Sequence, residues 1–225
     1  MEKNLRQQPY RRLIKVCSGH AVSPPAFVVL VHGDSMLRQL NLSDLHCISV
    51  VICQPGGRFD QLKGIEITSD LAIIHSIYPD HKILLITHLG TNNIGARNSA
   101  RRDKPSEFAL SLVNFLSGLV MENDYLYISV STVIPRLDIP NAVRECNNII
   151  IRACSKLQPR IIVLKSSYPY LLPNLDVPRL KQRNESLFSR DKLHFSSKGY
   201  EVFSNFIIYS IVNRRIPITP SSKPK

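Results

Sequence analysis

The chain has 225 residues, of which 44% are hydrophobic and 20% charged, and its formal net charge is +12. This length suffices for one domain with a sizeable core, and this composition excludes a disordered chain. No apolar run approaches the roughly 20 residues that cross a bilayer. The basic excess favours an acidic partner, most commonly nucleic acid, although a generally basic soluble surface is the alternative.

The N-terminus and the cysteines indicate the compartment. Residues 1–15 are polar and basic, and no apolar stretch of the secretory type follows them. The five cysteines are scattered, and no pair has the spacing of a zinc site. We therefore expect reduced core thiols in an intracellular, cytoplasmic protein, with no metal site.

Short apolar runs rich in β-branched residues alternate with helical patterns along the chain. The strand-like runs are 26–31, 47–53, 82–87, 125–130 and 160–164, and the helical patterns are 106–120, 141–157, 199–212 and, more weakly, 70–77. No hairpin turn joins consecutive strands, so the sequence predicts an α/β fold with a central, mainly parallel sheet of about five strands. We expect a basic lead-in at 1–25, one domain at 26–213 and a flexible tail at 214–225.

Polar motifs follow the predicted strands, and a parallel α/β sheet binds its ligands at the carboxyl ends of its strands. Gly33-Asp34-Ser35 follows the first strand, QPGGR (54–58) the second and HLGTNN (88–93) the third, while SRDKLHF (189–195) precedes the last helix. Each motif alone is explained more simply as a capped turn or a surface loop. Together they place a serine, glycines, an amide and an Asp/His pair where a site belongs.

These residue types are the ones that acyl transfer requires. A serine hydroxyl is a weak nucleophile that needs a base, and a histidine oriented by a carboxylate provides one. The spacing of Asp191 and His194 lets both side chains turn toward one point. The backbone N–H groups of Ser35 and Gly56, with the side-chain amide of Asn92, can supply the donors that a tetrahedral oxyanion needs.

The order of these motifs resembles that of the SGNH (GDSL-type) hydrolase superfamily, over roughly residues 27–211. The resemblance implies a flavodoxin-like three-layer α/β/α sandwich and a carboxylic ester hydrolase, esterase or lipase-like, without a cofactor. Carried over by motif, Ser35 is the nucleophile, Asp191 and His194 complete the catalytic triad, and Gly56 and Asn92 form the oxyanion hole.

Two positions in these motifs need comment. Gly57 replaces Gly56 in the oxyanion hole if the second motif is shifted by one residue. The third motif of the family usually reads Gly-x-Asn-Asp, and Asn93 stands here in place of the aspartate. Because that aspartate is generally a supporting residue, we expect a small cost rather than an inactive site.

A second function remains open because basic residues cluster near two of the motifs. The stretches CQPGGRFDQL (53–62) and STVIPRLD (131–138) resemble eukaryotic SGNH-like domains, namely the RNA-binding OSK domain of Oskar and esterase domains of non-LTR retrotransposons. RNA or another polyanion would bind through phosphate contacts. The candidate anion contacts are Arg97, Arg101, Arg102, Lys104, Arg183 and Arg190.

The complete set of catalytic residue types favours the hydrolase over the binding module. An RNA-binding descendant has no chemical need to keep Ser35, Asp191, His194 and Asn92 together. We therefore expect a small ester as the substrate and RNA or another polyanion as an alternative partner, and the sequence leaves the oligomeric state open.

Overall fold

The computed structural model describes residues 13–18, 27–45, 47–95, 102–136, 138–157, 159–165, 185–191 and 193–213. Its strands are β1 (Leu13–Ser18), β2 (Phe27–Gly33), β3 (Ile48–Cys53), β4 (Lys82–His88), β5 (Leu126–Ser131) and β6 (Ile161–Leu164). Its helices are α1 (Gln61–Ile77), α2 (Thr91–Ile94), α3 (Pro105–Glu122), α4 (Pro140–Cys154) and α5 (Ser197–Asn213), with short 3₁₀ turns η2 (Ser35–Leu37) and η5 (Glu185–Leu187).

The strands form one six-stranded sheet in the order β1-β3-β2-β4-β5-β6. The five strands predicted from the sequence, β2 to β6, all pair in parallel, so the predicted fold class is confirmed. The strand order reverses at β2, which has β3 on one side and β4 on the other. Such a reversal opens a crevice at the carboxyl ends of the strands, and β2 ends there at Gly33.

Strand β1 was not predicted, and it comes from the segment that the sequence analysis assigned to a basic lead-in. It pairs antiparallel with β3, from Leu13 opposite Cys53 to Ser18 opposite Ile48. An edge strand buries little and needs no continuous apolar run. Ile14 and Val16 are accordingly exposed, and the short LIKVCS stretch did not stand out from its basic surroundings.

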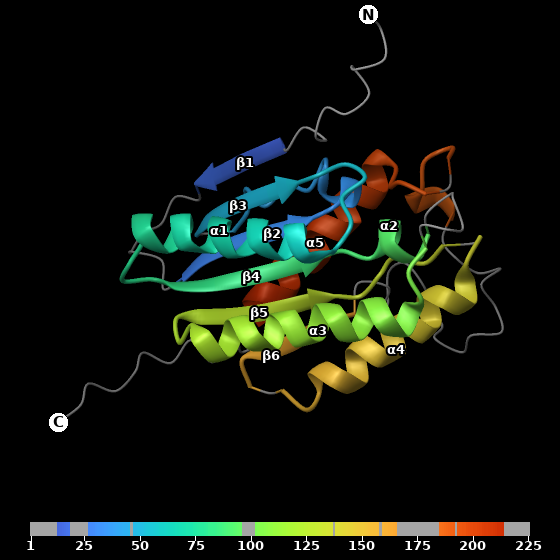
Figure 1. The fold of residues 1–225 in the computed structure, drawn as a ribbon. Helices are drawn as coiled ribbons and strands as arrows, with labels where there is room; N and C mark the ends of the chain where they lie inside the picture. Colours follow the sequence, from blue (N-terminus) through green and yellow to red (C-terminus); the bar gives the residue numbers. More distant parts are fainter. Residues whose placement is uncertain are drawn as a thin grey trace, which may run out of the picture.

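Helices cover both faces of the sheet (Figure 1), with α1, α3 and α4 on one face and α5 on the other. Successive side chains of β2 point to opposite faces of the sheet and so contribute to both hydrophobic cores. Val28 and Leu30 pack with α1, α3 and α4, whereas Val29 and Val31 pack on the α5 side. A strand buried on both faces reads as a continuous apolar run. Among the described helices, none is long and apolar enough to cross a membrane.

Helix α1 begins at Gln61, well before the start predicted at residue 70. The Asp60 carboxylate accepts a hydrogen bond from the Lys63 N–H at 2.9 Å and so caps the helix. Apolar residues occur all around α1, with Leu62 and Ile65 exposed and Ile67 buried. The 3.6-residue period that marks an amphipathic helix is therefore weak in this stretch.

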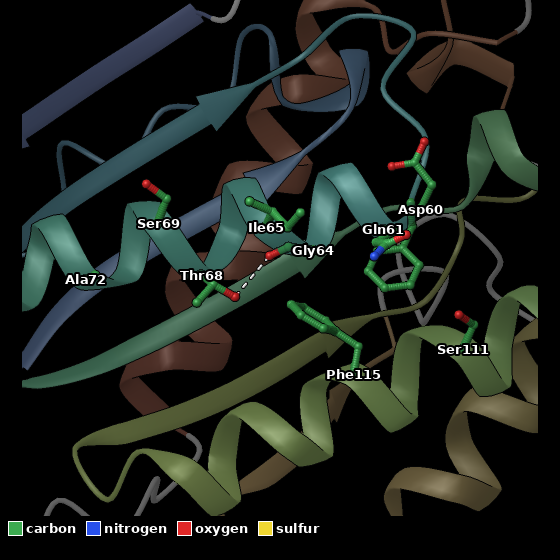
Figure 2. Close-up of a pocket in the computed structure, with 10 residues that line it drawn as sticks. Asp60, Gln61, Gly64, Ile65, Thr68, Ser69, Ala72, Ser111 and Phe115 are labelled. Atoms are coloured by element: carbon green, nitrogen blue, oxygen red, sulfur yellow. Dashed lines mark hydrogen bonds between the residues drawn. The ribbon is translucent and has the colours of Figure 1, made fainter.

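A groove of about 640 Å³ lies between α1 and α3 (Figure 2). Its lining consists of Phe59, Asp60, Gln61, Gly64, Ile65, Thr68, Ser69, Ala72, Ser111 and Phe115. Gly64 allows the close approach of the two helices, because a Cβ there would lie 3.2 Å from the Phe115 ring. The groove's lining includes no residue that the sequence analysis assigned to the site.

The close pairing of β2 with β4 yields a test of the fold. Gly33 lies opposite His88, and a Cβ at Gly33 would overlap the backbone carbonyl oxygen of His88 and the Leu37 side chain. We predict that Gly33→Ala lowers the free energy of unfolding by about 1–3 kcal/mol through overpacking. The measurement is equilibrium urea unfolding.

Gly118→Ala is the matched control, since a Cβ at Gly118 in α3 meets no atom within 4 Å. Alanine replaces glycine there inside a helix, so this variant should gain about 0.5–1 kcal/mol. Equal effects of the two substitutions would contradict the packing account.

Candidate active site

Ser35 lies at the turn that ends β2. The Asp34 carboxylate accepts a hydrogen bond from the Met36 N–H at 3.0 Å and caps the short turn η2 that carries the serine. Two backbone hydrogen bonds fix the entry to the turn, from the Asp34 N–H to the His88 carbonyl at 3.2 Å and from the Gln54 N–H to the Gly33 carbonyl at 2.9 Å. The Ser35 side chain is half-buried at the carboxyl end of the sheet.

The loop before α5 brings His194 and Asp191 to the same place. The distance from Ser35 Oγ to His194 Nε2 is 3.0 Å, and from His194 Nδ1 to Asp191 Oδ2 it is 2.7 Å. With the Nδ1–H donating to the carboxylate, Nε2 is the basic nitrogen that accepts from the serine hydroxyl. The three predicted triad side chains therefore form one hydrogen-bonded series, although His194 lies 159 residues from Ser35 in sequence.

This loop is held rigid by aromatic packing and backbone pairing. Phe188 and Phe195 form a β-bridge, and their rings lie 5.5 Å apart. The Ser189 N–H donates to the His194 carbonyl at 2.8 Å. From α5, the Tyr200 hydroxyl donates to the Ser35 carbonyl at 3.3 Å, which ties the helix to the turn that carries Ser35.

Asp191 is held as a carboxylate although it is partly exposed. Burial raises the pKa of this carboxyl, but hydrogen bonds from the His194 ring, the Ser189 hydroxyl and the backbone N–H groups of His194 and Leu193 outweigh burial and leave the pKa well below its ordinary value. The Ser189 hydroxyl donates to Oδ1 at 2.6 Å. The charge needed to orient the imidazole is therefore present throughout the neutral pH range.

The predicted oxyanion residues occupy two neighbouring loops, the loop after β3 and the loop after β4, which contains the short helix α2. Gly56 has φ 72°, a left-handed conformation that glycine adopts without strain. The Gly57 N–H donates to the Gln54 carbonyl at 2.8 Å and closes the turn. The Asn92 side-chain amide donates to the Gly57 carbonyl at 3.0 Å. Asn92 is thus tied to the glycine that the sequence analysis gave as the alternative to Gly56.

Two buried titratable groups near the site, Asp34 and His88, have no role in the predicted triad or oxyanion hole. Asp34 is fully buried, and burial raises its pKa to about 6, against a hydrogen bond from the Met36 N–H and the charge of His194. His88 is also buried, and burial lowers its pKa to about 4. Its Nδ1 lies 2.7 Å from Ser131 Oγ, and its ring packs on Phe203. Asp34 belongs to the Gly33-Asp34-Ser35 motif, and His88 begins the HLGTNN motif.

The candidate anion contacts are only partly described. Arg102, Lys104 and Arg190 are exposed, and Lys104 pairs with Glu107 at 2.9 Å. Arg190 is adjacent to Asp191 in sequence and therefore lies at the rim of the site. Arg97, Arg101 and Arg183 lie outside the described residues.

Solved structures with the same architecture include esterases and a GDSL-like lipase. A carbohydrate esterase family 3 protein from Talaromyces cellulolyticus aligns at 14% identity over 86% of this chain and 100% of its own, with a TM-score of 0.57. A protein from Parabacteroides merdae described as a GDSL-like lipase aligns at 9% identity, over 87% of this chain and 98% of its own, with a TM-score of 0.59.

A third solved structure is described as an SGNH hydrolase and comes from Slackia heliotrinireducens. It aligns at 12% identity over 83% of this chain and 100% of its own, with a TM-score of 0.50. At these identities the similarity establishes the fold. No protein-family model matches the chain, and no curated protein sequence does.

The buried Asp34 makes stability depend on pH in a defined direction. Its pKa is about 6 in the folded chain against an ordinary 3.8, so the stability that protonation confers is present at low pH and is lost as the pH rises through 6. Asp34→Asn keeps an acceptor for the Met36 N–H without the charge. We predict that the variant is more stable than wild type at pH 7.5, by up to about 3 kcal/mol, and equally stable near pH 4.

Urea unfolding of both proteins at the two pH values measures this difference. The wild-type profile alone is not informative, because the lowered pKa of His88 acts in the opposite direction and removes stability as the pH falls toward 4. If the difference in unfolding free energy between the two proteins does not change with pH, the raised pKa of Asp34 is refuted.

Proposed function

We propose, from the premise that the chain has the SGNH-hydrolase fold, that it is a serine hydrolase that cleaves carboxylic esters. The observation that carries this proposal is the series Ser35–His194–Asp191, with distances of 3.0 and 2.7 Å. The side chains come from the end of β2 and from the loop before α5. The fold can form without these three residue types, so their meeting as a nucleophile, a base and a carboxylate supports a catalytic role.

In the proposed reaction, His194 Nε2 takes the proton of the Ser35 hydroxyl as Oγ attacks the ester carbonyl. The tetrahedral intermediate collapses, the C–O bond to the alcohol breaks, and the imidazolium returns the proton to the leaving oxygen. Water then attacks the acyl-serine, again with His194 as the base, and the carboxylic acid leaves. Asp191 stabilises the imidazolium in both halves without taking its proton.

The donors for the oxyanion come from the two loops beside the nucleophile. The Ser35 N–H and the Gly56 N–H would bind the developing charge, because the Gly57 N–H, the alternative donor, already donates to the Gln54 carbonyl. Asn92 would contribute its side-chain amide, whose nitrogen carries two hydrogens; one is bound to the Gly57 carbonyl. Donors of this type typically contribute about 10²–10³ each in kcat.

Esters with short acyl chains are the substrates we propose to assay first. The solved structures of similar fold include an acetyl-xylooligosaccharide esterase and an acetyl esterase, and we extend the acetyl group in their names to this chain as a proposal. Acetate and butyrate esters of p-nitrophenol test it, because their leaving group needs little help from a general acid.

Ser35→Ala should abolish hydrolysis of p-nitrophenyl acetate, with kcat falling by about 10³-fold or more, because the attacking oxygen is removed. The fold should persist, since the serine is only half-buried. Ser43→Ala, which removes an exposed serine hydroxyl bonded to Asp44, is the matched control and should keep full activity.

An unchanged kcat in Ser35→Ala would refute this mechanism. A wild-type protein that hydrolyses neither ester would instead favour RNA binding, which the net charge of +12 supports. An RNA titration at two salt concentrations would then follow, because phosphate contacts make the affinity fall steeply with salt.

Asp191→Asn should reduce kcat by about 10³–10⁴-fold while leaving KM nearly unchanged. The amide no longer stabilises the imidazolium, and its nitrogen faces groups that donate hydrogen bonds to the carboxylate in the wild type. Steady-state kinetics with p-nitrophenyl butyrate measure both constants. A variant with near-wild-type kcat would show that the carboxylate only shapes the loop.

A further inference from the structure

The two loops that carry the proposed oxyanion donors are joined by a set of polar side chains. Asn93 is fully buried and bonds the backbone of Phe59 reciprocally: its Oδ1 accepts from the Phe59 N–H at 2.9 Å, and its Nδ2 donates to the Phe59 carbonyl at 2.9 Å. One amide side chain therefore holds the loop after β3 against the loop after β4.

Asp103 completes this contact from the approach to α3. Its Oδ2 accepts the other Nδ2 hydrogen of Asn93 at 2.6 Å, and its Oδ1 accepts from Arg58 Nη2 at 2.7 Å. The Asp103 N–H also donates to the Asn93 carbonyl at 3.0 Å. The Asp103 carboxylate thus links a side chain from each of the two loops.

Arg58 connects the same set of side chains to Asn92. Its Nη1 donates to the Asn92 carbonyl at 3.1 Å, and the Asn92 amide donates back to the Gly57 carbonyl at 3.0 Å. The Phe59 ring anchors the first loop in the core, where it packs 5.4 Å from the Phe115 ring. Both loops are therefore fixed to each other and to the α3 side of the core.

We propose that Asn93, Asp103 and Arg58 form a clamp that positions Asn92 and the Gly56-Gly57 turn for binding the oxyanion. These are positioning residues, and this role rests on the proposed esterase function. The clamp accounts for the departure at Asn93: an aspartate there would lack the hydrogens that bind the Phe59 carbonyl and would face the Asp103 carboxylate. The carboxylate absent from position 93 is supplied by Asp103.

The clamp is tested by exchanging its amide and its carboxylate. Asn93→Asp alone places two carboxylates together and should lower kcat about 100-fold, of the order that one oxyanion donor contributes. Asp103→Asn alone replaces an acceptor oxygen by an NH₂ group, although both the Asn93 amide and Arg58 donate to this position. This variant should lower kcat about 10-fold. In the double variant, the new amide at position 103 can donate to the new carboxylate at position 93 and accept from Arg58. Its kcat should therefore recover at least about 5-fold over Asn93→Asp, with KM near wild type throughout.

Glu107→Gln is the matched control, because it removes an exposed carboxylate at the start of α3 that pairs with exposed Lys104. It should leave kcat unchanged. A double variant no more active than Asn93→Asp, or a loss confined to KM, would overturn the clamp. Thermal unfolding of each variant separates loss of positioning from loss of the fold.

Hydrogen exchange at the Phe59 amide provides a readout that does not require activity. Asp103→Asn should speed this exchange at least about 5-fold relative to wild type and to Glu107→Gln, because the acceptor Asn93 Oδ1 is no longer held in place. Unchanged exchange would overturn the clamp. A wild-type protein that is inactive yet shows this difference would refute the proposed function and support the clamp.

Discussion

The close approach of β2 and β4 at Gly33 is the constraint on which the site depends. Only a residue without a Cβ fits against the His88 carbonyl at this point, and the Asp34 N–H bonds that same carbonyl at 3.2 Å. The chain therefore leaves β2 where the strand order reverses, and Ser35 follows within the first turn. In parallel sheets this is the place where loops from neighbouring strands converge.

Polar side chains that bond the backbone then fix each loop around the serine. Asp34 binds the Met36 N–H, Asp191 binds the N–H groups two and three residues beyond it, and Asn93 binds both backbone groups of Phe59. Carboxylates and amides suit this use because they satisfy backbone donors that short loops would otherwise leave unpaired. The same side chains set the electrostatics of the site, since Asp191 stays ionised while burial raises the pKa of Asp34 to about 6.

The parallel strands of the sheet could be predicted from the sequence more accurately than the antiparallel edge strand β1 and helix α1. The strands β2 to β5 are apolar runs buried on both faces, which is the pattern that sequence reveals most clearly, and β6, although it is a partly exposed edge strand, keeps a continuous apolar run. Strand β1 at the other edge lacks such a run, and α1 has apolar residues all around. The motif residues Ser35, Asp191 and His194 were found because chemistry demands their types together. The contact of Asn92 with Gly57 and the role of Asp103 were not predictable, because they depend on how two loops lie against each other.

Activation of Ser35 by His194 can be measured by mass spectrometry after treatment with a fluorophosphonate probe. Peptide mapping should place the adduct on Ser35 in the wild type, and His194→Ala should prevent labelling because the hydroxyl loses its base. A wild-type protein that acquires no adduct, or a His194→Ala variant that is labelled as well as wild type, would show that His194 does not activate Ser35.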